Sequence, residues 1–369
     1  MSKKPDPNDN EFCPIPVRDP GSKIINLAIQ GGGAHGAFAW GIIDRLLEDG
    51  RLHFESISGT SAGSMNAAAL AYGLLTGGRD GARQKLHDFW KAISDAGERF
   101  ALTKQMPWES FFNAGHDHSP SYEFLNALTH WLSPYQLNPF NFNPLSDVLK
   151  QQVDFERLQQ CQVTKLFISA TNVRSGKVRV FHTEEITAET VLASACLPQL
   201  FRAVEIDNES YWDGGYMGNP SLFPFFYHAK TTDVLLLHIN PIERSNVPTT
   251  ANEIFNRVNE ITFNSSLLHE FRAIAFVQKL LDDGWIKEEF RDKLKSIKLH
   301  AIRADKILSD LSAATKFSSN WKFLTELRDR GRLAASEWLT NTYDKVGTKS
   351  SVDLKAVYLN TGKHADHDD

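Results

Sequence analysis

Residues 57–64, with the sequence ISGTSAGS, join a strand-like run to a run of small, helix-forming residues. The residues before this stretch alternate apolar and polar side chains as a β-strand does, and residues 62–75 favour a helix. Gly59-x-Ser61-x-Gly63 at such a junction is the pattern of a nucleophile elbow, in which two glycines let neighbouring backbone pass close to an exposed serine. The helix that follows would direct the positive end of its dipole at the serine hydroxyl. The stretch therefore suggests Ser61 as a nucleophile, although many matches to this pentapeptide are ordinary turns.

A second glycine-rich junction comes one element earlier in the chain. Residues 23–30 form an apolar run typical of a strand buried on both faces, and the loop GGGAHG at residues 31–36 leads into a helical pattern over residues 37–47. Together with a strand over residues 51–58, these segments predict a βαβ unit whose two loops meet at one edge of a parallel sheet. Consecutive glycines leave bare N–H groups that can converge on an anion. The expected anion-binding residues are Gly31, Gly32, Gly33 and Gly36, and the first three would form an oxyanion hole opposite Ser61.

The same loop also matches the G-x-G-x-x-G fingerprint of dinucleotide-binding proteins. That fingerprint expects an acidic residue at the end of the second strand, to bind a ribose hydroxyl. Residues 58–61 here are Ser-Gly-Thr-Ser, and the nearest acid, Glu55, lies inside the expected strand. Without its acid the fingerprint is weak support for NAD. We therefore expect no cofactor.

The overall composition is that of a globular protein. The chain has 369 residues, of which 41% are hydrophobic and 23% charged, and its three cysteines have unrelated spacings. Neither a disulfide framework nor a zinc site is suggested by that spacing, and a net charge of -5 argues against a nucleic-acid partner. No apolar window is long enough for a spanning helix, and residues 1–22 contain no secretory apolar region. We expect a cytoplasmic protein, with peripheral membrane contact and homo-oligomers left open.

Residues 97–145 differ in character from the rest, because they gather many aromatic side chains among proline and asparagine. Such a long insertion is expected to be a lid or acyl-chain pocket, or else a packing layer, and the two interpretations stay open. His116 and His118 lie inside it without further ligands at fixed offsets, so no metal site is expected. Farther on, residues 164–182 predict a β-hairpin, and residues 187–194 predict a short helix.

A third junction holds an acidic residue. Asp213-Gly214-Gly215 follows a short strand-like run and precedes an apolar strand over residues 233–239. Asp-Gly-Gly is by default a tight turn. At this place, however, the aspartate would stand at the tip of another strand and face Ser61.

The three glycine-containing motifs, in this order, resemble those of the patatin-like phospholipase family of acyl hydrolases. The resemblance covers residues 24–226, with the anion loop at 31–36, the elbow at 59–63 and the Asp-Gly-Gly motif at 213–215. It implies a three-layer α/β/α fold around a central, mostly parallel sheet. The apolar spacing over residues 253–281 and 320–342 separately predicts a helical C-terminal extension. It also implies a catalytic dyad of serine and aspartate that works without histidine.

In that dyad Ser61 would attack the ester carbonyl, and Asp213 would accept its proton and return it to the leaving group. Family members often carry Asp before the glycines and Arg or Lys near their end, whereas this chain has Gln30 and His35. A neutral or titrating His35 would bind a phosphate or carboxylate less firmly. This departure bears on the preference for anionic head groups and leaves the dyad intact.

The expected function is hydrolysis of carboxylic esters of lipids, as a phospholipase A, a lysophospholipase or a carboxylesterase. One alternative is an α/β-hydrolase triad in which a later histidine such as His228 joins Ser61 and Asp213. A second alternative is acyl transfer to an alcohol or thiol from the same serine. A third is a catalytically inactive patatin-like scaffold that binds lipid or a partner.

The expected organisation has four parts. They are an N-terminal arm (1–22), a catalytic domain (23–240), a helical region packed on it (241–346) and a flexible tail (347–369). Within the helical region, residues 298–302 predict a short strand. The helices around it fit three roles equally, which are covering the sheet edge, forming a dimer face and touching a bilayer.

Overall fold

The protein is built around one central β-sheet. The computed structural model describes residues 21–102, 132–160, 164–244, 246–291, 293–308, 311 and 313–360. Its strands are β1 (Lys23–Ile29), β2 (Leu52–Gly59), β3 (Lys165–Asn172), β4 (Val178–His182), β5 (Val204–Ile206), β6 (Glu209–Asp213), β7 (Asp233–His238) and β8 (Lys298–Arg303). The order across the sheet is β5, β6, β3, β2, β1, β7, β8, and β4 pairs with β3. The path from β3 to β8 is parallel, whereas β4, β5 and β6 pair in antiparallel fashion.

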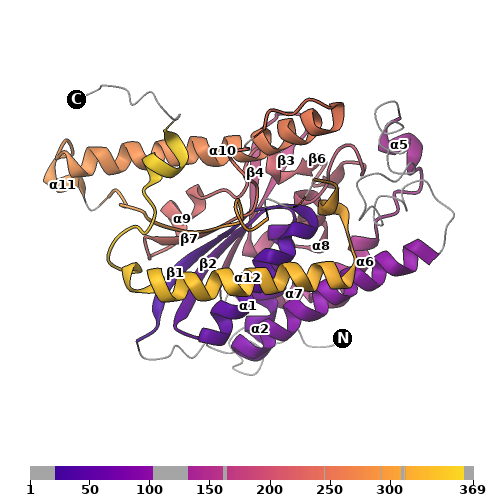
Figure 1. Ribbon diagram of the computed structural model, residues 1–369, viewed down its shortest axis with the longest axis horizontal. Coiled ribbons are helices and arrows are strands. Elements are labelled where there is room, and N and C mark those ends of the chain that lie inside the picture. The colour runs from indigo at the N-terminus through magenta and orange to yellow at the C-terminus, as the bar shows by residue number, and fades with distance from the viewer. Residues whose placement is uncertain are drawn as a thin grey trace.

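Helices cover both faces of this sheet. They are α1 (Gly36–Asp49), α2 (Ala62–Leu102), α5 (Pro134–Leu137), α6 (Pro144–Gln152), α7 (Phe155–Gln160), α8 (Ala188–Ser194), α9 (Phe223–His228), α10 (Ala251–Asp282), α11 (Glu288–Arg291) and α12 (Trp321–Thr342). In Figure 1, α1, α2 and α12 gather on one side of the sheet, and α9 and α10 lie on the other. This is the three-layer α/β/α fold with a mostly parallel sheet that the resemblance implied.

The strand residues divide between two apolar layers. Leu27 and Ile29 of β1 pack with α1 and α12, whereas Ala28 between them packs with Leu236 and the side chains of α10. Successive side chains of a strand point to opposite faces. A strand covered on both faces is therefore mostly apolar, and in β1 the buried Asn26 side chain donates to the Thr231 carbonyl at 3.0 Å.

The last long helix lies directly on the first. A Cβ atom on Gly41 of α1 would overlap the carbonyl oxygen of Arg328, and one on Gly331 of α12 would overlap that of Phe38. Only residues without a side chain allow two helix backbones to approach so closely. The glycine pair therefore seats α12 against α1.

Most of the local predictions are confirmed. Residues 23–58 form the βαβ unit β1, α1 and β2, residues 164–182 form the hairpin of β3 and β4, and residues 187–194 form α8 with its N-cap Thr187. Residues 144–160 form two helices, α6 and α7, because Val153 after α6 adopts an extended conformation.

The sheet continues beyond residue 240, since β8 covers the predicted strand and pairs with β7. Residues 347–360, which we expected within a flexible tail, are packed against the sheet. The Ser351 N–H donates to the carbonyl of Leu299 at 3.0 Å, and the buried Tyr358 ring contacts Phe271. Burial of such apolar side chains is the physical reason that this segment is ordered.

Several sequence expectations fall outside the described residues. These are the N-terminal arm up to residue 20, the part of the aromatic insertion between residues 103 and 131 with His116 and His118, and residues 361–369. In the described part of the chain, no helix is long and apolar enough to cross a membrane. The same residues contain no group of three or more His, Cys, Asp or Glu side chains that could hold a metal ion.

Candidate active site

Ser61 occupies a strained turn between β2 and α2. Its φ of 55° lies in the left-handed region that residues with a side chain rarely adopt. The turn is tightly packed, because a Cβ on Gly59 would lie 2.5 Å from the Gly63 carbonyl oxygen. One on Gly63 would overlap the carbonyl of Ile29. The Ser61 N–H donates to Ser194 Oγ at 2.9 Å, which anchors the turn to the end of α8. The strand, turn and helix that the motif predicted are therefore present.

Asp213 ends β6 and is completely buried. Its Oδ1 accepts a hydrogen bond from the Gly215 N–H at 2.7 Å, whereas Oδ2 has no hydrogen-bond partner in the described part of the chain. Burial raises the pKa of the Asp213 carboxyl to about 7, even though the Gly215 N–H and the neighbouring Ser61 hydroxyl favour its ionised form. A carboxylate with such a pKa is suited to exchange protons near neutral pH.

The two glycines after Asp213 make its position possible. A Cβ on Gly214 would overlap the Ser169 carbonyl, and one on Gly215 would lie 3.0 Å from Asp213 Oδ1. Side chains at these positions would push the carboxylate away from its place beside the elbow. The Asp-Gly-Gly turn therefore has a steric role as well as a conformational one.

The glycine loop between β1 and α1 lies against the elbow. A Cβ on Gly31 would be 2.6 Å from Ser61 Cβ, so this close approach requires glycine. The Gly31 N–H donates to Asn219 Oδ1 at 2.8 Å and is not presented to an oxyanion, which corrects our expectation for this residue. The Gly36 N–H is likewise used, because it donates to the Gly33 carbonyl in the 3-10 turn over residues 33–35 that precedes α1. Gly32 and Gly33 remain as candidate donors to an oxyanion, because no hydrogen bond inside the described part of the chain uses their N–H groups.

A buried polar network holds this loop in place. Asn240 donates from Nδ2 to the Gly31 carbonyl at 2.7 Å, and its own N–H donates to Gln30 Oε1 at 2.9 Å. Lys316 Nζ donates to Asn240 Oδ1 at 3.0 Å, and burial lowers the pKa of this lysine. The Lys316 backbone also covers Gly33, since a Cβ there would overlap its carbonyl oxygen. Gln30, in the place where the family often carries Asp, thus accepts hydrogen bonds as a neutral amide.

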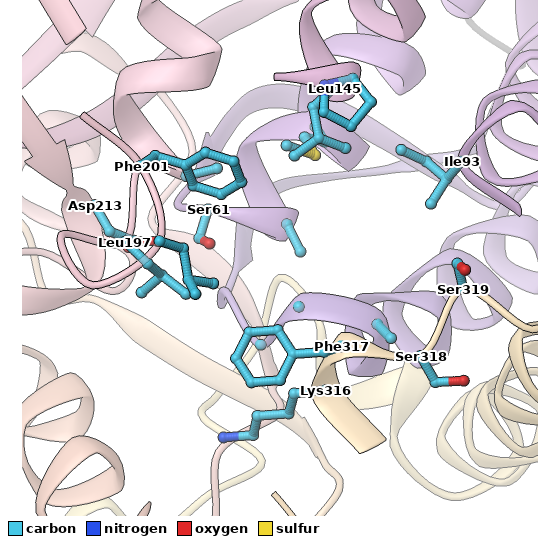
Figure 2. Close-up of a pocket in the computed structure, with 18 of the residues that line it drawn as sticks. Ser61, Ile93, Leu145, Leu197, Phe201, Asp213, Lys316, Phe317, Ser318 and Ser319 are labelled. Atoms are coloured by element: carbon cyan, nitrogen blue, oxygen red, sulfur yellow. The ribbon is translucent and has the colours of Figure 1, made fainter. Parts of the chain in front are cut away.

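Ser61 and Asp213 open onto a cavity of about 210 Å³. Figure 2 shows Leu197 and Phe201 beside this pair, with Ile93 and Leu145 farther along the wall. Residues 316–319 form another part of the wall, and the amino group of Lys316 points away from Ser61. Part of the aromatic insertion lines the cavity as well, from residue 134 to residue 145. The cavity is therefore lined mostly by apolar residues, and its polar residues include Ser318 and Ser319 on the far wall as well as Ser61 and Asp213.

The histidine that a catalytic triad requires and the acid that a dinucleotide site requires are both engaged in other contacts. No histidine is found among the described residues that line the cavity. His228 packs its ring on Phe167 at the end of α9, and His35 Nε2 is hydrogen-bonded to Thr315 Oγ1 at 2.7 Å. Glu55, the acid nearest in sequence to the end of the second strand, accepts the N–H groups of residues 230 and 231 just before β7.

Comparison with known proteins identifies the family of this chain. The sequence model of patatin-like phospholipases matches residues 27–226, more than half of the chain, and the protein belongs to that family. No curated protein matches the sequence. Among solved structures, the crystal structure of VipD from Legionella pneumophila is similar over 92% of this chain and 73% of its own, with 14% sequence identity and a TM-score of 0.39. Patatin-like phospholipases are lipid acyl hydrolases, and membership of the family supports this class of activity for the protein.

Proposed function

We propose that the protein hydrolyses carboxylic esters of lipids through an acyl intermediate on Ser61, with Asp213 as the general base. The observation that carries the proposal is the placement of a strained serine beside a fully buried carboxylate at one end of an apolar cavity. The Ser61 Oγ would form a bond to the ester carbonyl carbon while its proton passes to Asp213. The N–H groups of Gly32 and Gly33 would hold the negative oxygen of the tetrahedral intermediate.

The second half of the reaction reverses these proton transfers. When the carbon–oxygen bond to the alcohol breaks, Asp213 returns the proton to the leaving oxygen. Water then loses a proton to Asp213 and attacks the acyl carbon, and Ser61 recovers its proton as the fatty acid leaves.

The environment of Asp213 makes its carboxylate a stronger base than an exposed carboxylate would be. With an ordinary pKa of 3.8 the carboxylate would hold a serine proton poorly, whereas burial raises this pKa to about 7. A base whose pKa lies near the working pH combines a large ionised fraction with useful proton affinity. The N-terminus of α2, the positive end of the helix dipole, lies at Ser61 and would stabilise the negative charge that develops there. This environment supports a dyad without histidine.

Labelling with a fluorophosphonate tests the nucleophile directly. The reagent should modify Ser61, as identified by mass spectrometry of the labelled peptide, and the protein should hydrolyse short p-nitrophenyl esters. Ser61→Ala and Asp213→Asn should each remove nearly all turnover. The matched control is Ser318→Ala, which removes another buried serine from the wall of the same cavity and should leave labelling intact.

The same experiment distinguishes the alternatives. Full activity in Asp213→Asn would contradict the dyad, and a loss in His228→Ala as large as that in Ser61→Ala would favour a triad. A folded protein that is neither labelled nor active on any ester would instead be a lipid-binding scaffold. A panel of phospholipids, lysophospholipids and simple esters would then rank the substrates of an active enzyme.

A further inference from the structure

One exposed apolar surface continues directly from the wall of the cavity. We call residues 133–143, which include α5, the aromatic rim. Pro134 and Leu137 of the rim line the cavity, whereas Tyr135 is 56% exposed and Phe140 is 85% exposed. Phe142 does both, since it lines the cavity and is 40% exposed. A single short segment thus presents apolar side chains both to the cavity and to the outside.

Hydrogen bonds hold the rim in a defined conformation. The buried Asn138 donates from Nδ2 to the Phe142 carbonyl at 2.8 Å and accepts the Phe142 N–H at 2.9 Å. Arg202 donates to the carbonyls of Tyr135 and Pro139, and its guanidinium lies 5.1 Å from the centre of the Tyr135 ring. These contacts close the loop and fasten its base. These contacts hold the backbone on both sides of Phe140, so the exposed position of the Phe140 ring follows from the conformation of the rim.

The composition of the rim indicates what it contacts. Its sequence, SPYQLNPFNFN, contains no charged residue and three aromatic ones. In Figure 1, α5 lies at one end of the molecule, outside the two helical layers. An uncharged aromatic loop can enter the head-group region of a bilayer without desolvating an ion, and aromatic side chains favour that region. The rim contributes no lysine or arginine of its own, and Arg202 at its base donates to the Tyr135 and Pro139 carbonyls, which fits a zwitterionic surface better than an anionic one.

We propose that the aromatic rim docks the protein on the surface of a lipid bilayer, with Phe140 inserted among the head groups. The inference rests on the proposed action on lipid esters, because the rim shares residues with the cavity that would receive the acyl chain. Docking there would place the cavity mouth against the layer in which the substrate resides. The substrate could then pass from the bilayer to Ser61 with little exposure of its acyl chain to water.

Binding to phosphatidylcholine vesicles tests the proposal independently of turnover. Vesicle cosedimentation is measured for Ser61→Ala, which cannot consume the lipid, alone and combined with Phe140→Ser. Partitioning should weaken by about tenfold or more, since tenfold corresponds to the lower end of the free energy gained by burying a phenylalanine side chain. The matched control is Leu333→Ser, which removes another exposed apolar side chain, 72% exposed on α12, and should bind like the parent.

A second measurement separates docking from catalysis. With Ser61 intact, Phe140→Ser should hydrolyse a soluble short-chain ester as fast as the parent and should lose activity only on vesicles. Vesicle binding that is absent in the parent, or equal in Phe140→Ser and Leu333→Ser, would overturn the proposal. If the parent is a dimer and Phe140→Ser is a monomer, the rim would instead be the contact surface for a second copy of this chain. Vesicle binding by a parent without esterase activity would refute the proposed function and leave the docking surface standing.

Discussion

Replacing Asp213 with asparagine should abolish turnover and, at the same time, stabilise the fold at alkaline pH. The carboxyl is fully buried, and its pKa is raised to about 7 from an ordinary 3.8. Above pH 7 the folded protein therefore holds a buried charge that the unfolded chain would hold in water. Asparagine has nearly the same shape and keeps an oxygen for the Gly215 N–H, which donates to Asp213 Oδ1 at 2.7 Å. The substitution thus removes the charge with little change in packing.

The size of the effect follows from the two pKa values. The gap between 3.8 and about 7 is roughly three pH units, and one unit corresponds to about 1.4 kcal/mol, so ionised Asp213 destabilises the folded state by up to about 4 kcal/mol. Because the folded pKa is raised, proton binding favours the native state. That stabilising contribution is complete below the unfolded pKa of 3.8 and is lost as the pH rises through about 7. The advantage of Asp213→Asn should therefore be largest above pH 7 and small near pH 4.

Urea unfolding at several pH values measures this difference. The parent, Asp213→Asn and a control, Asp80→Asn, would be compared from about pH 4.5 to pH 8.5; the Asp80 side chain is 97% exposed, and its loss should matter little at any pH. In parallel, kcat/KM of the parent should rise with pH to a plateau, with a midpoint near the Asp213 pKa of about 7. An Asp213→Asn protein that is no more stable than the parent at pH 8.5 would refute the reasoning. So would a kinetic midpoint near pH 4.

Two further predictions concern the loops around Ser61. Gly63→Ala should lower the free energy of unfolding by about 3 kcal/mol and abolish ester turnover, because the new Cβ would overlap the Ile29 carbonyl. Gly77→Ala, with no atom within 4 Å of its Cβ, is the control, and equal urea midpoints for the two would contradict the steric argument. Asn240→Ala should lower kcat by about 10²-fold with little change in KM, since the glycine loop loses the donor to the Gly31 carbonyl and its free N–H groups shift. Steady-state kinetics check this, and an unchanged kcat would show that the loop keeps its shape without the network.

The fold was predictable largely because its signals are local. The apolar run of β1, the glycine loop and the elbow are contiguous in sequence, and parallel strands bring their carboxyl ends to one edge. That rule suffices to place the Ser61 turn beside the glycine loop. Asp213 ends an antiparallel strand, so the rule for parallel strands does not place it, and its position beside the serine was expected from its place at a strand tip and from the family resemblance.

The hydrogen bonds that shape the glycine loop join residues far apart in the sequence, so no local sequence pattern predicts them. The Gly31 N–H is taken by Asn219, 188 positions away, so counting glycines overstated the number of free donors. Lys316 reaches the loop through Asn240, 76 positions earlier, and nothing in its local sequence marks it. The packing of residues 347–360 was missed for the same reason, because Leu354 and Tyr358 are buried by the helix that contains Phe271.

The wall formed by residues 316–319 bears on how an inhibitor of this protein could be made selective. This wall lies outside residues 27–226, the part that the family model matches, although it borders the same cavity as Ser61. A warhead that reacts with the serine exploits chemistry that the family resemblance implies for other members. A substituent that reaches Phe317 would instead contact a surface contributed by the remaining part of the chain. An inhibitor selective for this protein over its relatives should therefore carry a substituent that contacts Phe317.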